Sequence, residues 1–532
     1  MTDLVATALG YPTVVIGVFG LVSVVGGVLV YLFTIKPALS PLNVIPGPKS
    51  THWLFGSLKE IIDTKWSKGH FPQPALSWVK KYGGAVHYRA FLRHRVLITD
   101  PEALKHVFNT KADNYPRSTD SRLFLREIIG GDGLLSSEGD AHTHMRKMLM
   151  PHFGFAKVRQ FIDVFAGQTQ ALSSQLDRLA DTNAPVDMHD LFTKLTLDII
   201  GLSAFGYDFQ SLTNQNERVM AAYKMMNQPP SILFAVGRVY LPFFDRWPLR
   251  AIQRRNDAKR MLFQTVDDVI SAKLKAPRRR TGAATDLVDL MLDNQSTEHK
   301  VSAEEARTHV MTFLTAGHET TSSTLCWVFS MLATHPEMET KARSECHDVA
   351  AANNGRIEWK SLGELKYVTA FIQETLRLYP TIAALATRET ATDDYLPMAS
   401  GKSYFVPKGT TIAVNTGALH RNPMYWSTPD EFVPERFLEG SEPFAADKVL
   451  RHGQGNTYYY MPFSAGAKNC IGMRFAMAEL QVVVSNLLLK YSFKVTNQAD
   501  LNPKQDGVSI KPVKLDMMVH RAATSFSTVD SP

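Results

Sequence analysis

Apolar residues recur every three to four positions over long parts of this chain, which is the spacing of one buried helix face. The pattern predicts helices at residues 161–180, 188–205, 258–274, 303–333 and 473–490. Shorter apolar runs predict β-structure at residues 86–97 and 402–414, the second interrupted by a Pro-Lys-Gly turn. The chain is therefore expected to be mainly α-helical with small β-sheets.

The N-terminal segment differs from this pattern because its apolar residues are continuous. Residues 13–35 carry no charge and are long enough, as a helix, to cross a bilayer core of about 30 Å. A cleaved signal peptide would have basic residues near its start and a shorter apolar region, whereas here the only charged residue before the apolar run is the acidic Asp3. We therefore expect a retained membrane anchor, and Lys36 directly after it favours a cytosolic body.

Changes in composition divide the whole chain into four segments. We expect an anchor at residues 1–36 (transmembrane helix about 13–35), a proline-rich hinge at 37–50, one catalytic domain at 51–520 and a disordered tail at 521–532. No repeat or Gly/Ser-rich linker interrupts the third segment, so it is expected to fold as a single large domain.

Charge and cysteine content limit the possible partners and compartment. The formal net charge is +7, yet no aromatic-basic motif of nucleic-acid-binding proteins accompanies it. A basic surface facing an acidic protein partner or anionic lipid is the better interpretation. Three cysteines in 532 residues provide no disulfide framework, which indicates a reducing compartment.

One of these cysteines, Cys470, lies in the run FSAGAKNCIG, directly before the helix expected at residues 473–490. Gly466 and Gly472 permit tight turns and close backbone approach. The N-terminus of the following helix favours negative charge on sulfur. A thiolate in such a loop can ligate heme iron and favour O–O cleavage; the alternative is an ordinary buried thiol.

Two further motifs lie within expected helices. The run AGHETT at residues 316–321 interrupts an apolar helix, where glycine is costly and threonine hydroxyls commonly bond to carbonyls one turn earlier. A small residue there can also leave room for a diatomic ligand and a water. Glu374 and Arg377 are three positions apart among apolar residues, which indicates a buried pair on one helix face.

Together with GDAHTHMRK at residues 139–147 and PERF at residues 434–437, these motifs resemble those of the cytochrome P450 family of heme-thiolate monooxygenases, in the family's order. The family's heme loop reads Phe-x-x-Gly-x-Arg/His-x-Cys-x-Gly. This chain departs from it only at Lys468. It also has His142 where the family usually has Trp. The resemblance covers essentially the whole chain after the N-terminal segment.

The resemblance implies roles for individual residues. Cys470 would be the axial ligand of iron in heme b. The residues expected to contact this cofactor are Cys470, Arg146, His142, Arg388, Lys468, Phe463, Gly466 and Gly317. The acid–alcohol pair Glu319 and Thr320 would carry protons to bound O2. Glu374, Arg377 and Arg436 would form a structural network that holds the cysteine loop.

The resemblance also implies a cytochrome P450 fold and an activity. The protein would insert one oxygen atom from O2 into a lipophilic small molecule, such as a terpenoid, steroid, fatty acid or other secondary metabolite. Electrons would come from NADPH through NADPH–cytochrome P450 reductase, with cytochrome b5 as a second candidate donor. The expected location is the endoplasmic reticulum membrane, with a single-pass anchor contacting membrane lipid and no nucleic acid partner.

Two other functions are weighed against this one. A heme-thiolate isomerase or dehydratase acting on hydroperoxides would need no reductase, and the pair Glu319 and Thr320 counts against it. A non-catalytic heme gas-binding protein is expected to carry a signalling module, and none is visible. Mainly apolar positions are expected to line the substrate pocket: residues 121–128, Phe313, Ala316, residues 382–385 and residues 508–510. The apolar segment at residues 229–247 has two readings, a mobile cover that dips into the membrane or a helix-packing segment.

Overall fold

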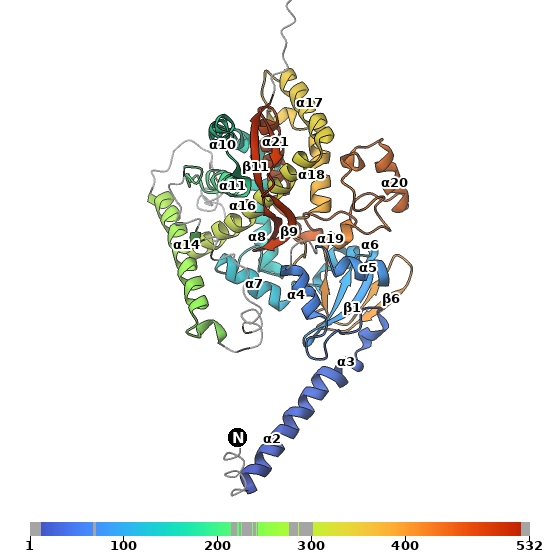
Figure 1. The fold of residues 1–532 in the computed structure, drawn as a ribbon. Helices are drawn as coiled ribbons and strands as arrows, with labels where there is room; N and C mark the ends of the chain where they lie inside the picture. Colours follow the sequence, from blue (N-terminus) through green and yellow to red (C-terminus); the bar gives the residue numbers. More distant parts are fainter. Residues whose placement is uncertain are drawn as a thin grey trace, which may run out of the picture.

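The computed structural model describes residues 12–66, 71–213, 243–275 and 302–522, with a few isolated positions between residues 221 and 286. Within these residues the chain is mainly helical, with four small sheets and one helix projecting from the body (Figure 1). Most of the expected apolar segment at residues 229–247, and residues 523–532 of the expected tail, lie outside the described residues.

Helix α16 (Ala303–Thr334) runs through the centre of the body and organises the packing around it (Figure 1). Ser302 and Glu305 form a capping box that fixes its start. Helix α11 (Met188–Phe205) packs along it and has the bounds that its apolar spacing predicts. Gly206 ends α11 in a left-handed conformation, with φ +58°.

The other long helices lie around this pair. They are α10 (Ile162–Thr182), α14 (Arg250–Lys275), α17 (Pro336–Ala352), α18 (Lys366–Leu378) and α21 (Met473–Leu488). The shorter helices of the body are α4 (Leu58–Trp66), α5 (Ala75–Tyr82), α6 (Pro101–Lys105), α7 (Thr119–Ile129), α8 (Gly139–Leu149), α9 (Phe155–Val158), α19 (Thr416–His420) and α20 (Glu442–Leu450). Helix α14 begins eight residues before the expected start, because its first two turns are largely polar and exposed.

The described strands form four small sheets. One has strand order β1 (Ala85–Ala90), β2 (Arg93–Ile98), β7 (Thr411–Ala413) and β4 (Arg388–Glu389). The others pair β10 (Ser509–Lys514) with β9 (Asp500–Asp506), β5 (Asp394–Pro397) with β6 (Ser403–Val406), and β11 (Asp516–Arg521) with both β3 (Val186–Asp187) and β8 (Tyr491–Val495). The two expected β-runs are thus a hairpin and a pair of strands in different sheets, because turns at Phe91 and Gly409 divide them.

The N-terminal helix is continuous from α2 (Pro12–Val30) through a π-helical turn (Tyr31–Ile35) into α3 (Lys36–Ala38). Its segment Ile16–Ala38 is apolar and long enough to span a membrane, and its side chains are largely exposed. At its base Phe33 is buried, with its ring 5.7 Å from that of Trp53 and 5.4 Å from that of Phe91. The base of the helix is therefore packed against the body.

Candidate active site

The loop before α21 places Cys470 at the wall of a cavity. The backbone N–H of Cys470 donates to the carbonyl of Phe463 at 2.9 Å, which closes the loop. Gly466 has φ +69°, and a Cβ there would lie 1.9 Å from the carbonyl oxygen of Phe108. Glycine is required at this position because any larger residue would push the loop away from that backbone.

The cavity has a volume of about 720 Å³ and lies between α7, α8, α16, the cysteine loop and the sheet that contains β1 and β2. Most of the lining is apolar, and the expected pocket positions Phe124, Phe313, Ala316, Leu385 and Val508 are part of it. Cys470 supplies the only sulfur among the described residues that line it. Such an apolar cavity with few polar groups is typical of a small-molecule site.

Burial raises the pKa of the Cys470 thiol, although the backbone N–H of Gly472 and the Arg146 guanidinium both lower it. The side chain is exposed only in the sense that it opens onto this cavity. The helix N-terminus was expected to favour the thiolate, but desolvation outweighs it. A stable thiolate here needs a further positive charge, which a bound metal ion provides.

A cluster of cations lies beside the cysteine loop. Glu138 accepts from Arg117 Nη1 at 3.1 Å and also pairs with the Nζ of Lys468. Arg146 Nη1 donates to the carbonyl of Asn469 at 2.8 Å, so it is tied to the residue next to Cys470. Sequence reasoning missed Arg117 and Glu138, because only the fold brings them to the loop.

Two buried nitrogens in this cluster have no hydrogen-bond partner among the described residues: Nε2 of His142 and Nε of Arg388. Burial, with a further contribution from Arg117 and Lys468, lowers the pKa of His142 to about 4, so the ring is neutral at pH 7. Burial and Arg117 lower the pKa of Arg388 to about 10. Unpaired buried donors of this kind are costly, and two carboxylates of a ligand such as heme would satisfy them.

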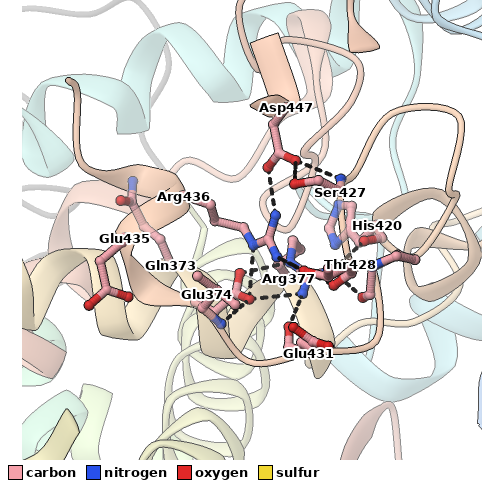
Figure 2. A network of polar contacts seen from close by, with 12 residues as sticks. Gln373, Glu374, Arg377, His420, Ser427, Thr428, Glu431, Glu435, Arg436 and Asp447 are labelled. Atoms are coloured by element: carbon pink, nitrogen blue, oxygen red, sulfur yellow. Dashed lines mark hydrogen bonds and ion pairs between the residues drawn. The ribbon is translucent and has the colours of Figure 1, made fainter. Parts of the chain in front are cut away.

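Behind the loop, Glu374, Arg377 and Arg436 form a fully buried ion-pair network (Figure 2). Arg377 Nε lies 2.7 Å from one Glu374 oxygen, and Arg436 Nε lies 3.1 Å from the other. Asp447 from α20 adds a second carboxylate, 2.7 Å from Arg436 Nη1. Asp447 follows Arg436 in the chain but is not part of any of the sequence motifs, so sequence reasoning did not identify it.

His420 connects this network with the cysteine loop. Its carbonyl accepts from Arg377 Nη1 at 2.8 Å, and its ring Nε2 accepts from the backbone N–H of Met461 at 2.8 Å. Met461 precedes Phe463 by two residues in the chain. A shift of Arg377 would therefore be transmitted to the segment that carries Cys470.

Thr320 of α16 also lines the cavity, and it donates its hydroxyl to the carbonyl of Ala316 at 2.7 Å. Glu319 is directed away, because its carboxylate accepts from Val508 N at 3.1 Å and from Ser509 Oγ at 2.9 Å. The structure thus brings Thr320, but not the carboxylate of Glu319, to the cavity wall. Helix packing also favours glycine at position 317, because a Cβ there would lie 2.9 Å from Ile200 of α11.

Comparison with known proteins decides the family. The cytochrome P450 family model matches residues 46–519. Cytochrome P450 monooxygenase 205 of Postia placenta is 30% identical over 502 residues, which cover 87% of this chain and 88% of that protein. This chain belongs to the cytochrome P450 family.

Other relatives of this P450 agree. Cytochrome P450 4A14 of Rattus norvegicus is 30% identical over 462 residues, covering 85% of each chain. The crystal structure of the cytochrome P450DA heme domain has a TM-score of 0.73 and 24% identity, covering 90% of this chain and 98% of that one, which shows the same fold. The protein is thus a P450 monooxygenase, and heme and O2 follow from its family. The thiol, the unpaired donors and the cation cluster described above fit that cofactor.

Glu479 on α21 is a buried acid of this P450 that sequence reasoning did not single out. It is 1% exposed, and burial raises its pKa well above the usual range, partly opposed by a hydrogen bond with Thr321. It is therefore a neutral acid that links α21, the helix after Cys470, to α16 beside Thr320. No sequence spacing marks it, because a single Glu in an apolar helix gives no motif.

The neutral state of Glu479 predicts an unusual response to Glu479→Gln. The unfolded chain releases this proton at a pH of about 4.3, whereas the folded protein keeps it, so the acid lowers the stability of the wild type progressively as pH rises above that value. We expect the Gln variant to equal or exceed the wild type in thermal stability at pH 8, with the difference shrinking toward pH 5. Thermal melts at both pH values measure this, and a Gln variant less stable at pH 8 would show that Glu479 is ionised.

Proposed function

We propose that this P450 inserts one oxygen atom from O2 into a lipophilic small molecule, with electrons from NADPH delivered by NADPH–cytochrome P450 reductase. The observation that carries the proposal is the cavity, which has Cys470 on one wall and Thr320 on another, with mainly apolar residues between them. An apolar enclosure of this kind selects a substrate by shape and excludes water from the reacting centre.

Each residue around the cavity has a proposed part. Cys470 binds the iron, while His142, Arg146, Arg388 and Lys468 hold the two carboxylates of the heme. Phe463 and Gly317 line the cavity and would let the chain approach the cofactor closely, whereas Gly466, which was expected to contact the cofactor, does not line the cavity and instead lets the loop pack against Phe108. When bound, the heme supplies the oxygen-activating chemistry. The chain's own contribution is to position the substrate and to deliver protons.

Proton delivery is assigned to Thr320, whose hydroxyl is at the cavity wall. Glu319 is the proposed proton source behind it, and its carboxylate must first leave its bonds to Val508 and Ser509. Those two bonds also attach α16 to the turn between β9 and β10. Proton delivery would therefore be coupled to a small displacement of that turn.

The proposed location is the endoplasmic reticulum membrane. The apolar helix Ile16–Ala38 supports a single-pass anchor. Lys36 near its C-terminal end supports a cytosolic catalytic domain, where the reductase or cytochrome b5 would act as electron donor.

Replacing Thr320 by alanine tests the function and the proton route together. With reductase, NADPH and a lipophilic substrate, we expect the variant to consume NADPH while the product formed per NADPH falls several-fold. The reason is that the hydroxyl that would deliver protons at the cavity wall is missing. Thr334→Ala is the matched control, since its hydroxyl makes the same type of bond, to Ser330 O at 2.8 Å, at the far end of α16. It should keep wild-type coupling.

Different results would support the competing functions. Reductase-independent turnover of a hydroperoxide, with no oxidation supported by NADPH, would favour an isomerase or dehydratase. Carbon monoxide binding without turnover of either kind would favour a gas-binding protein. An unchanged yield of product per NADPH in Thr320→Ala would reject the proposed proton route but not the monooxygenase function.

A further inference from the structure

One acid stands behind the cations that face the cavity beside Cys470. Those cations are Arg117, Arg146, Arg388 and Lys468. Among the described residues, no Asp or Glu lines the cavity itself. Glu138 approaches from outside the lining, where it pairs with both Arg117 and Lys468. Only 14% of its side chain is exposed, so water and salt screen these two ion pairs little.

Glu138 occupies the N-cap position of α8, where a side chain commonly bonds the free N–H groups of the first turn. Its carboxylate makes no such bond. It accepts instead from the backbone N–H of Arg117 at 3.2 Å and from Nη1 of the same residue at 3.1 Å. With Lys468 as a further partner, Glu138 joins three segments of the chain: the residues before α7, the start of α8 and the cysteine loop.

The charges of this cluster show why an acid is needed there. Without Glu138, four cations would face the two carboxylates of a heme, and buried charges are costly unless they are paired. Glu138 adds a third carboxylate. Burial alone would raise the pKa of Glu138, but Lys468 and Arg117 lower it below its ordinary value, so the acid is ionised at pH 7.

The side chain at position 468 also needs a fixed geometry. Lys468 stands where the family's heme loop has Arg or His. A guanidinium binds a carboxylate with a rigid planar fork, whereas the ammonium of lysine is a point charge on a flexible stem. The contact with Glu138 engages one N–H donor of the Lys468 ammonium and leaves the other two for a ligand in the cavity, which Lys468 lines.

We propose that Glu138 is a positioning residue, which holds the Lys468 ammonium against a heme carboxylate and so supplies the fixed geometry that an arginine would have on its own. This inference rests on the proposed function, in which Lys468 holds a heme carboxylate, and it names the residue that enables a lysine to do so. Because Glu138 does not line the cavity, it acts through Lys468.

Heme release from the full-length holoprotein tests the proposal without any turnover. The holoprotein is mixed with excess apomyoglobin, which captures released heme, and the rate of transfer is measured. We expect Glu138→Gln to release heme about fivefold to tenfold faster than the wild type, because a neutral amide holds the ammonium less tightly than a carboxylate does. The amide keeps the shape of the acid and can still accept from Arg117, so the variant should fold.

An arginine at position 468 separates positioning from a merely structural role. In the Lys468→Arg background, Glu138→Gln should leave the rate of heme release unchanged, because the guanidinium fork needs no support. A structural role of Glu138, such as tying Arg117 to α8, would give the same acceleration in both backgrounds. Resonance Raman bands of the heme propionates give a second readout, and they should shift in Glu138→Gln.

Glu339→Gln is the matched control. Glu339 pairs with Arg343 on α17, its side chain is 19% exposed, and it does not line the cavity. This variant should keep the wild-type rate and the wild-type propionate bands. Equal heme release by the wild type and Glu138→Gln, or the same acceleration with lysine and with arginine at position 468, would overturn the proposal. Both readouts need neither reductase nor substrate, so a failure of oxidation with these results intact would count against the proposed function only.

Discussion

Cys470→Ser is expected to abolish the spectrum of a thiolate-ligated heme in the reduced carbon monoxide complex and to reduce oxidation of any substrate to background. A serine hydroxyl does not ionise at the pH where a metal-bound thiol does, so it cannot supply the same electron density to the iron. Glycines on both sides of the loop remain, so the fold itself should tolerate this near-isosteric change.

A second cysteine, Cys346, provides the control. Cys346 on α17 is buried away from the cavity, and burial raises its pKa to about 12, so it is an inert thiol. Cys346→Ala should keep the carbon monoxide spectrum and the activity. A thiolate-type spectrum that persists in Cys470→Ser would move the ligand elsewhere and sink the assignment.

Glu374→Ala is expected to have the largest effect on stability. It leaves Arg377 and Arg436 without the carboxylate that both now share in a site with no solvent exposure. Removing one partner of a buried charge network costs about 3–5 kcal/mol, against a total stability of about 5–15 kcal/mol for a folded protein. We expect little folded holoprotein at 37 °C and a lower midpoint in urea unfolding.

A milder variant and a surface control make this prediction decisive. Asp447→Asn removes a carboxylate from the edge of the network and keeps its shape, so a smaller loss is expected. Glu435→Gln is the surface control. Glu435 directly precedes Arg436, and its carboxylate pairs with the exposed Lys341 at 2.9 Å. It should change the free energy of unfolding by about 0–1 kcal/mol. Equal stability of Glu374→Ala and Glu435→Gln would show that the buried network does not hold the loop.

Local pattern carried much of the fold prediction. The bounds of α11 follow from its apolar spacing, and the residues of the cysteine loop and of the Glu374 pair form contiguous motifs that a single sequence reveals. Asp447, Glu138 and Arg117 were not foreseen. They reach their sites through turns and strand register, and no periodicity links them to the residues they approach.

The orientation of Glu319 was also beyond local reasoning. Its spacing beside Thr320 fits a paired role at the cavity. In the structure its carboxylate is turned aside by two donors almost 190 residues away in the chain, Val508 in the turn before β10 and Ser509 at the start of β10. Long-range donors of this kind leave no trace in the sequence around the acid.

The packed base of the N-terminal helix has a consequence for substrate supply. Phe33 packs against Trp53 and against Phe91, which lies in the turn between β1 and β2, so the helix is attached to the part of the body that carries this sheet. Figure 1 shows α3 next to that part. If the helix crosses a bilayer as proposed, the sheet that carries β1 and β2 and lines part of the cavity lies on the membrane side of the body. The concentration that governs saturation is then that of the lipophilic substrate dissolved in the lipid, so the apparent KM would follow the partition coefficient of the substrate.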